Sequence, residues 1–441
     1  MRIYSLLTTS LMMCGIFGLG NLTTQAAAQE STAVMELRRL VEAQQKQLEV
    51  QQRQLASQQK QLEMQEKQFE LQKQSLQDLQ AKFKSIDEEK PTVTYATPDN
   101  VITSDGPGNI KLSISGHVNR AMNVVSDGKD TKAYFVDNDN SESRINIVGT
   151  GKINEDLTLG SRLEVSIAPN NAGIVNQIDE EAGDFFEQRW VEVSLDSKRF
   201  GKLSLGRGYT ASYGTASSDL SGTNVIATST IADLAGGMLF RQSSDDSLTD
   251  IRIGDAFNDF NGLSRKNRFR YDTPKFYGFQ LALSAVSDDR YDAGLYWGGQ
   301  GYGFKAVAAA GIADLSEDDT DFQYSGSFSI LHEETGLNLS LAAGGKNRDI
   351  QDDATNYFVK AGWLADLFSF GKSAFSVDYT LGENLPTDDD EGYSYGIAAV
   401  QQFNDYGAEL YGMYRLYSLD RDAEPDVHDI GVSSIGLRVK F

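Results

Sequence analysis

The stretch LTLGSRLEVSI, residues 157–167, decides how the larger part of this chain folds. Leucine, valine and isoleucine occupy alternate positions in it, whereas Arg162 and Glu164 fall between them. Successive side chains of a β-strand point to opposite faces, so this alternation predicts a strand with one apolar face and one polar face.

The same two-residue period recurs from Lys111 to the end of the chain, and it appears clearly in residues 337–343 and 435–441. We count sixteen such strands. Short connections alternate with mostly longer, acidic ones, which is typical of an outer-membrane barrel whose apolar face meets lipid. We therefore predict an all-β, 16-stranded antiparallel transmembrane β-barrel over residues 111–441. The short set comprises 154–156, 196–201, 273–278, 332–336 and 403–407; the longer set comprises 126–142, 169–185, 313–321, 382–392 and 419–429.

Residues 29–90, ahead of the barrel, follow a period of seven. An apolar side chain recurs at every seventh position from Val34 to Phe83, which predicts an α-helical coiled coil of roughly 80 Å at 1.5 Å per residue. The second row of the seam is mostly glutamine and buries little apolar surface, so we expect the barrel to hold the chains together. A disordered glutamine-rich tract is the alternative, but disorder has no reason to keep the register. The central seam residues are Leu48, Leu55, Leu62, Phe69 and Leu76.

The first 28 residues read as a secretory signal peptide, with an apolar run from Leu6 to Leu19 and small residues before Gln29. Residues 91–110 contain three prolines and read as a linker. The single cysteine, Cys14, lies in the leader, so we expect no thiol chemistry in the exported chain. Both ends of an even-stranded barrel lie on the side of the short turns, so we expect the coiled coil in the periplasm.

Composition argues against several other functions. A formal charge of −23 opposes binding to nucleic acid. Only three histidines are present and none has a plausible serine and acid partner, so we expect no catalytic residues and no enzyme. The acidic runs at 179–181 and 388–391 lack the spaced ligands of a calcium loop, so we expect neither a metal nor a cofactor.

Three stretches resemble the trimeric general porins of Gram-negative bacteria: SRINIVGTGKINEDLTLGSRLEV (143–165), RWVEVSLDSKRFGKLSLGRGYT (189–210) and NRFRYDTPKFYGF (267–279). A porin that carries an N-terminal periplasmic coil resembles the DcaP-like proteins, trimeric channels linked to dicarboxylate uptake. The resemblance implies that a long third loop, here 208–262, folds into the lumen and constricts it. It also implies that Arg144 and Arg207 belong to the channel wall.

Alternation independently places Arg144, Arg162, Arg268 and Arg270 on the lumen side. Arg207, in contrast, shares parity with leucines that face lipid, unless the glycines beside it permit a bulge. Arg120 also has lipid-facing parity, and the sequence leaves its orientation open. Loop acids such as Asp219 and Asp233 are expected to face the wall arginines.

These observations predict a homotrimeric outer-membrane channel for small anions, with dicarboxylates as the favoured class. Alternatives within this class are a phosphate-selective or an unselective porin. A different alternative is an envelope tether whose coil contacts peptidoglycan while the barrel only anchors it. We expect the acidic outer loops to meet lipopolysaccharide, and the terminal Phe441 to resemble the assembly signal of these barrels.

Overall fold

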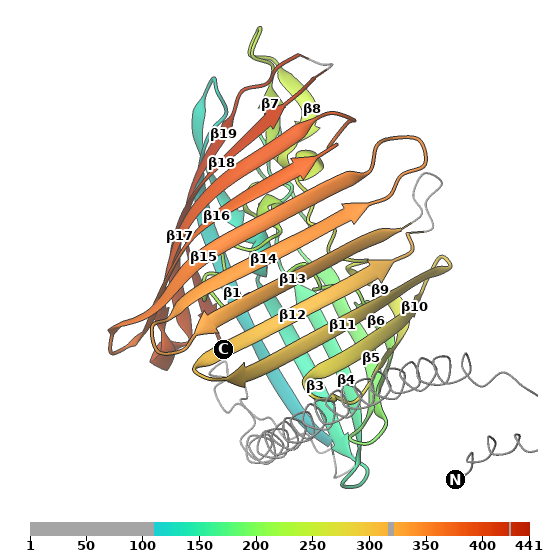
Figure 1. The fold of residues 1–441 in the computed structure, drawn as a ribbon. Coiled ribbons are helices and arrows are strands. Elements are labelled where there is room, and N and C mark those ends of the chain that lie inside the picture. Colours follow the sequence, from blue (N-terminus) through green and yellow to red (C-terminus); the bar gives the residue numbers. More distant parts are fainter. Residues whose placement is uncertain (1–109, 316–321, 423–424) are drawn as a thin grey trace, which may run out of the picture. The chain divides into compact units, whose positions relative to one another are not determined.

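The computed structural model describes residues 110–315, 322–422 and 425–441. The predicted signal peptide, coiled coil and nearly all of the linker lie outside these residues and remain predictions. The described chain is almost entirely β-structure, arranged as one barrel (Figure 1). Its strands are β1 (Ile110–Ser126), β2 (Thr131–Asp137), β3 (Arg144–Lys152), β4 (Leu157–Ser166), β5 (Glu187–Ser197), β6 (Gly201–Tyr209), β9 (Arg265–Asp272), β10 (Phe279–Val286), β11 (Arg290–Gly301), β12 (Phe304–Ala313), β13 (Gln323–His332), β14 (Leu337–Lys346), β15 (Ala354–Phe368), β16 (Gly371–Glu383), β17 (Glu391–Phe403), β18 (Ala408–Asp420) and β19 (Ile430–Lys440).

The barrel closes where its first strand pairs with its last. Strand β1 runs antiparallel to β19 from the pair His117–Lys440 to the pair Ser126–Gly431. On its other edge β1 pairs first with β3 and then with β2, so these two form a single interrupted strand. The seventeen strands of the sheet therefore make a closed ring of sixteen, which confirms the predicted strand number.

One predicted loop is wrong. Residues 126–142 were expected to be a long acidic connection, but residues 131–137 form β2. Within β2 the two-residue period holds, since Tyr134 and Val136 are buried inside the barrel and Phe135 between them is exposed. The hairpin from β1 to β2 turns through residues 127–130 only.

The outer face of the barrel is a band of exposed apolar side chains. Strands β4, β5 and β6 show the pattern, because Leu159, Leu163, Val193, Leu203 and Leu205 are all at least 39% exposed. A continuous apolar surface of this kind is stable in lipid and not in water. No helix in the described ranges is long and apolar enough to cross a bilayer.

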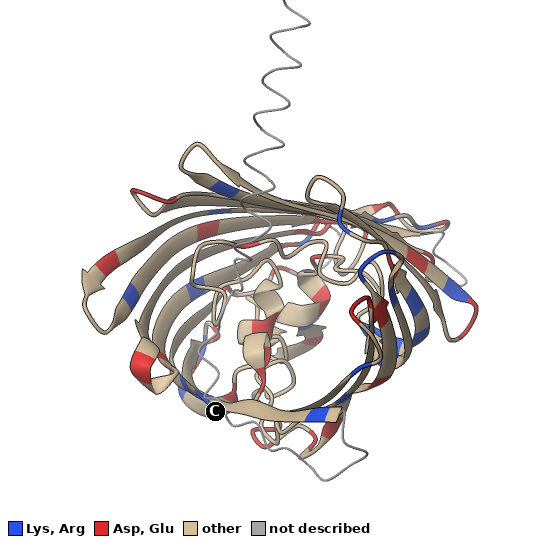
Figure 2. Cartoon of the chain, turned by 90° about the horizontal axis from the view of Figure 1, so that it is seen from below, with Lys and Arg blue, Asp and Glu red and all other residues tan. Residues whose placement is uncertain are grey.

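The connection between β6 and β9, residues 210–264, folds into the barrel, and we call it the inward loop (Figure 2). It contains a 3-10 turn, η2 (Ile231–Leu234), a small hairpin of β7 (Leu239–Arg241) and β8 (Leu248–Arg252), and a helical turn, α2 (Ile253–Ala256). The expected constriction loop, 208–262, lies within two residues of these bounds.

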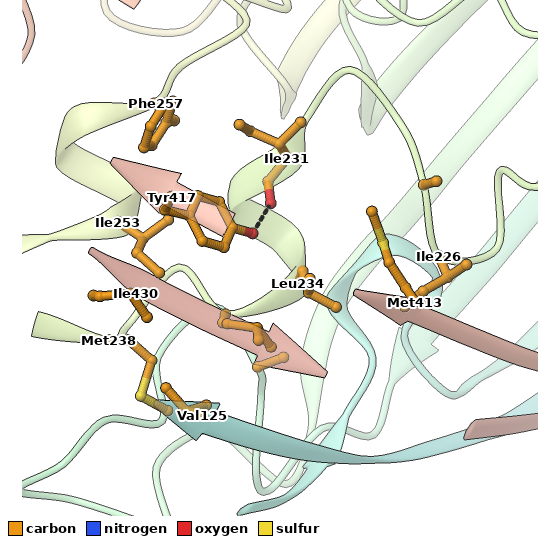
Figure 3. Packing of buried hydrophobic residues seen from close by; sticks show 14 of the residues in the cluster. Val125, Ile226, Ile231, Leu234, Met238, Ile253, Phe257, Met413, Tyr417 and Ile430 are labelled. Atoms are coloured by element: carbon orange, nitrogen blue, oxygen red, sulfur yellow. Dashed lines mark hydrogen bonds between the residues drawn. The ribbon is translucent and has the colours of Figure 1, made fainter. Parts of the chain in front are cut away.

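A hydrophobic core lies inside the barrel, between the inward loop and one side of the wall. The loop contributes buried side chains such as Ile231, Met238 and Phe257, and the wall contributes Tyr417 and Ile430 (Figure 3). The hydroxyl of Tyr417 donates to the carbonyl oxygen of Ile231 at 2.6 Å. Each large apolar side chain that is fully buried contributes about 1.5–3 kcal/mol, so this packing holds the loop against strands β1, β2 and β14–β19.

Candidate functional site: the constricted lumen

A cavity inside the barrel lies on the side that the inner hydrophobic core does not occupy. It has a volume of about 810 Å³ and lies between the inward loop and the wall strands β1, β3, β4, β5, β9 and β19. We call it the central chamber. Its basic lining residues are Arg144, Arg162, Arg189, Arg265, Arg438 and Lys440, and its acidic ones are Asp139, Glu142, Glu164, Asp233 and Asp259.

The interruption between β2 and β3 supplies two of these acids. Residues 139–141 form a 3-10 turn, η1 (Asp139–Ser141), and the side chain of Asn138 accepts a hydrogen bond from the Asn140 amide at 3.0 Å. The Asn138 amide nitrogen also donates to the carbonyl oxygen of Val225 in the inward loop, at 3.0 Å. The broken strand therefore fixes both the wall carboxylates and the loop that faces them.

Three wall arginines surround the buried carboxylate of Glu164. Arg162 donates to it at 2.5 Å, Arg189 donates at 2.7 Å, and Arg144 lies 3.6 Å away. Arg189 also donates to Glu142, so three guanidinium groups share two carboxylates. The carboxyl group of Asp139 adjoins Glu142, because the side chain of Asn171 donates to both. Three guanidinium groups and three carboxyl groups are therefore gathered on this side of the chamber.

Arg189 was not predicted, because its parity in β5 matches lipid-facing residues such as Val191. The pairing of β4 with β5 shifts by one residue between Glu164 and Val165, and this β-bulge turns Arg189 inward. A register shift of this kind leaves no mark in the alternation, so the sequence offered no signal for it.

Arg265 differs from the other arginines of the chamber. In the described part of the chain it has no carboxylate within ion-pair distance, and it lies over three aromatic rings. Its guanidinium carbon is 6.0, 5.7 and 6.0 Å from the ring centroids of Trp190, Tyr209 and Tyr213. Cation–π contacts orient a guanidinium without occupying its donors, so Arg265 offers N–H groups to the chamber.

The aromatic rings also hold Arg162. Its guanidinium carbon lies 3.9 Å from the centroid of the Trp190 ring, and Trp190 contacts Tyr209 edge-to-face at 4.3 Å. Two guanidinium groups from different strands therefore face the same indole. Sequence reasoning missed Arg265, because its parity in β9 equals that of the exposed Phe269.

The acids of the inward loop face this basic wall. Asp233 is half-buried and, among the described residues, its carboxylate accepts no hydrogen bond. Burial raises the pKa of Asp233 well above its usual range, and the nearby carboxylates of Asp139, Asp259 and Glu142 raise it further. The guanidinium of Arg265 acts in the opposite direction and lowers the pKa of Asp233. Burial raises the pKa of Asp259 as well.

Arg268 and Arg270 line a second cavity of about 520 Å³, which extends from Arg162 towards the short turns. Arg268 is buried; it pairs with Glu192 and donates to the carbonyl oxygen of Tyr209 at 2.8 Å. Arg270 binds both oxygens of Asp272 and donates to the Thr210 carbonyl at 2.6 Å. Both face the lumen as alternation predicted, but their donors are occupied by the barrel itself.

Arg207 does not line either cavity. It pairs across the sheet with Val191 and Asn267, and its neighbour Leu205 pairs with the exposed Phe269, so Arg207 lies on the outer face. Its guanidinium donates to the Gln188 carbonyl at 2.9 Å. The family motif implied that Arg207 belongs to the channel wall, whereas alternation placed it on the lipid-facing side, and the structure agrees with alternation. Gly206 has φ +121°, yet the register between β5 and β6 is unbroken.

Arg120 also lies on the outer face, where it forms an ion pair with the buried Asp137 at 2.7 Å. Asp219 does not meet an arginine. It pairs instead with Lys360 of β15, whose ammonium lies 2.6 Å from the Asp219 carboxylate.

Phe441 exchanges two backbone hydrogen bonds with Gly116, at 2.8 and 2.9 Å, and so extends the pairing between β1 and β19 that closes the barrel.

A closed, lipid-facing barrel around a charged passage defines a diffusion channel of the outer membrane rather than an enzyme. The chain belongs to the Gram-negative porin family, whose model matches residues 96–422. A search of curated proteins returned no match.

Solved structures of outer-membrane proteins share the fold at low sequence identity. An anion-selective porin from Comamonas acidovorans is 17% identical, with a TM-score of 0.52 over 75% of this chain and all of the other. OmpT of Vibrio cholerae is 14% identical, with a TM-score of 0.50 over 78% and 100% of the two chains. The outer membrane channel DcaP of Acinetobacter baumannii is 12% identical, with a TM-score of 0.50 over 77% and 100%.

Proposed function

We propose that this porin is a homotrimeric, anion-selective diffusion channel and that small dicarboxylates are its favoured solutes. One observation carries the proposal: the central chamber exposes the guanidinium groups of Arg162 and Arg265 to a solute. Arg265 has no carboxylate partner among the described residues, and Arg162 keeps 36% of its side chain exposed although it contacts Glu164. The description of the Comamonas acidovorans porin as anion-selective is consistent with this chemistry.

The selectivity follows from where the charges lie rather than from their sum. Exposed charges more than about 8 Å apart are largely screened at physiological ionic strength, so the acidic outer loops act weakly on a solute inside the channel. Charges in a narrow passage with walls of low dielectric constant act more strongly, because the field is focused there. The wall arginines therefore outweigh the net charge of −23.

A carboxylate in the chamber exchanges part of its hydration for paired N–H donors from guanidinium groups. Arg162 and Arg265 lie over the same indole, at 3.9 and 6.0 Å from centroids of Trp190, so one short dianion reaches both. Glu164 competes with the solute for the donors of Arg162, and the negative charge of Asp233 opposes an anion beside Arg265. Binding is consequently weak, which lets the solute leave again.

The reversal potential of the purified channel in a KCl gradient tests this proposal. We expect the wild type to prefer Cl⁻ and the double variant Arg162→Ala/Arg265→Ala to shift towards K⁺. The matched control is Arg207→Ala, which removes an arginine from the outer face and should leave the potential unchanged. A wild type that prefers K⁺, or a double variant that behaves as wild type, would favour an unselective porin. Block of the chloride current by phosphate but not by succinate would favour the phosphate-selective alternative.

The heptad repeat of residues 29–90 favours a second role at the periplasmic side. We propose that the coiled coil accompanies a trimer of barrels, and peptidoglycan contact through it is the alternative function. The acidic outer loops are proposed to face lipopolysaccharide. Co-sedimentation of the full-length exported protein with purified peptidoglycan, compared with a chain that starts at Thr92, tests the tether; equal sedimentation of both would exclude the coil as the contact.

A further inference from the structure

A third cavity opens from the side of the central chamber. It has a volume of about 280 Å³ and lies between residues 213–233 of the inward loop and the wall strands β14 and β15. We call it the side chamber. Tyr213, Asn224 and Asp233 line both cavities, so the two adjoin along these residues.

The side chamber does not suit a second negative charge. Asp219 and Asp233 both line it, and its basic residue is Lys360. The Lys360 ammonium is already bound to Asp219 at 2.6 Å and to the carbonyl oxygen of Ala227 at 2.8 Å, and it is 1% exposed. A carboxylate that entered would meet two acids and no available cation, so the far end of a dicarboxylate is disfavoured here.

Neutral polar groups in the side chamber are available. The exposed side chain of Asn224 and the hydroxyl of Ser218 make no hydrogen bond to the described residues. The Ser218 backbone amide donates to the hydroxyl of Ser327 at 2.9 Å, so the backbone that carries this side chain is held against the wall. An amide and a hydroxyl together offer both donors and acceptors, which is the pattern that an uncharged hydroxyl group requires.

An aromatic ring forms the threshold between the two chambers. Tyr213 packs against Tyr209 with ring centroids 4.4 Å apart. The guanidinium carbon of Arg265 lies 6.0 Å from the centroid of the Tyr213 ring. The central chamber presents a cation beside this ring, Asn224 lines both cavities, and Ser218 lines the side chamber. A solute that extends across it meets a positive charge at one end and neutral hydrogen-bonding groups at the other.

We infer that the side chamber binds the hydroxylated end of a monocarboxylate whose carboxylate lies on Arg265 in the central chamber. The solute class is the polyhydroxylated monocarboxylates, the chemistry of sugar acids, in addition to the short dicarboxylates proposed above. The inference rests on the proposed anion-selective function, since Arg265 supplies the charge, but it concerns a separate set of residues.

Block of the chloride current in planar bilayers tests the inference, with gluconate and hexanoate as probes of equal charge and equal carbon number. We expect gluconate to block at a several-fold lower concentration than hexanoate. The variant Asn224→Ala/Ser218→Ala should abolish that difference and keep the block by succinate. Asn224 and Ser218 donate no side-chain hydrogen bond to the described residues, so the variant should fold, and an unchanged heat-modifiability of the barrel confirms that it has done so.

The control Asn267→Ala replaces an exposed asparagine of β9 that pairs with Arg207 on the outer face, and it should keep the wild-type preference for gluconate. Equal block of the wild type by gluconate and hexanoate would overturn the side-chamber inference, and so would a gluconate preference that survives in the double variant. A wild type selective for K⁺ would instead overturn the proposed function, so the two failures are distinguishable.

Discussion

The ammonium of Lys360, on the barrel wall, donates to the carboxylate of Asp219, on the inward loop, across 2.6 Å in a site where the lysine is 1% exposed. The pair joins two residues separated by 141 positions, and the lysine also donates to the Ala227 carbonyl. It is thus an electrostatic attachment of the loop to the wall, next to the hydrophobic core that holds the same loop.

Replacing Lys360 with methionine should release this part of the loop. Removal of one partner from a buried ion pair costs about 3–5 kcal/mol, because the other charge stays buried without compensation. We expect Lys360→Met to make residues 210–264 more sensitive to protease and to lower the temperature of heat-modifiability. The double variant Lys360→Met/Asp219→Asn should recover most of the loss. A single variant as resistant as wild type would show that the pair does not hold the loop.

The anion preference should increase as the pH falls. Burial and neighbouring carboxylates raise the pKa of Asp233, so it becomes protonated at a higher pH than an ordinary aspartate near 3.9. Protonation removes a negative charge opposite Arg265, so the ratio of Cl⁻ to K⁺ permeability should rise as the pH falls, and the rise should begin above the pH range in which ordinary aspartates titrate. Asp233→Asn should show a weaker pH dependence. A wild-type ratio that changes only in the range of ordinary aspartates would contradict the raised pKa.

Arg268 should affect stability more than selectivity. It is 2% exposed at the side chain, and its donors are taken by Glu192 and by backbone carbonyl oxygens. Arg268→Met should therefore lower the temperature of heat-modifiability by leaving Glu192 without its partner. The chloride preference should remain close to that of the wild type, in contrast to Arg162→Ala/Arg265→Ala. A large change in reversal potential with unchanged stability would place Arg268 among the solute-binding groups instead.

Phe441 should be needed for insertion into the outer membrane. Its backbone exchanges two hydrogen bonds with Gly116, and its ring lies where a side chain at position 116 would collide with it. Deletion of Phe441 shortens the pairing between β1 and β19 that closes the barrel, so we expect a sharply lower amount of heat-modifiable protein in outer-membrane fractions. Substitution of the exposed Tyr406, an aromatic residue in a neighbouring short turn, is the control. Wild-type levels after the deletion would argue against an assembly role.

The barrels should associate without the coiled coil. The seam of residues 34–86 is apolar in one row and mostly glutamine in the other, so it buries little surface on its own. A chain that begins at Thr92 should still migrate as a heat-labile trimer in mild detergent. Recovery of monomers alone would identify the coil as the element that drives assembly.

Alternation predicted the wall well, because each lipid-facing position has to be apolar over most of every strand. It correctly placed Arg144 and Arg162 in the lumen, and it placed Arg207 on the outer face more accurately than the family motif did. It failed where local geometry departs from the two-residue period. Arg189 turns inward at a β-bulge. The strand that pairs with β1 is interrupted between β2 and β3, so the sequence pattern assigned β2 to a loop.

The alternation of apolar and polar residues did not predict the hydrophobic core inside the barrel. Tyr417 and Ile430 face the lumen and yet are large and apolar, because the inward loop covers them. Alternation of apolar and polar residues identifies the two faces of a strand only if the inner face meets water and is therefore polar. Here the inward loop covers part of the inner face, so the inner positions there are apolar as well. The side that the loop leaves uncovered keeps polar inner positions, and there the sequence did locate part of the site.

A ring of sixteen strands with an empty interior is a hole through which water and ions pass. In this protein Ile430 and Val432, on the last strand of the ring, belong to the same buried cluster as Ile253 and Met238 of the inward loop. The strand that seals the ring is therefore also the strand that completes the seat of the constriction. The last strand thus takes part both in the pairing with β1 that closes the barrel and in the packing that holds the loop inside it.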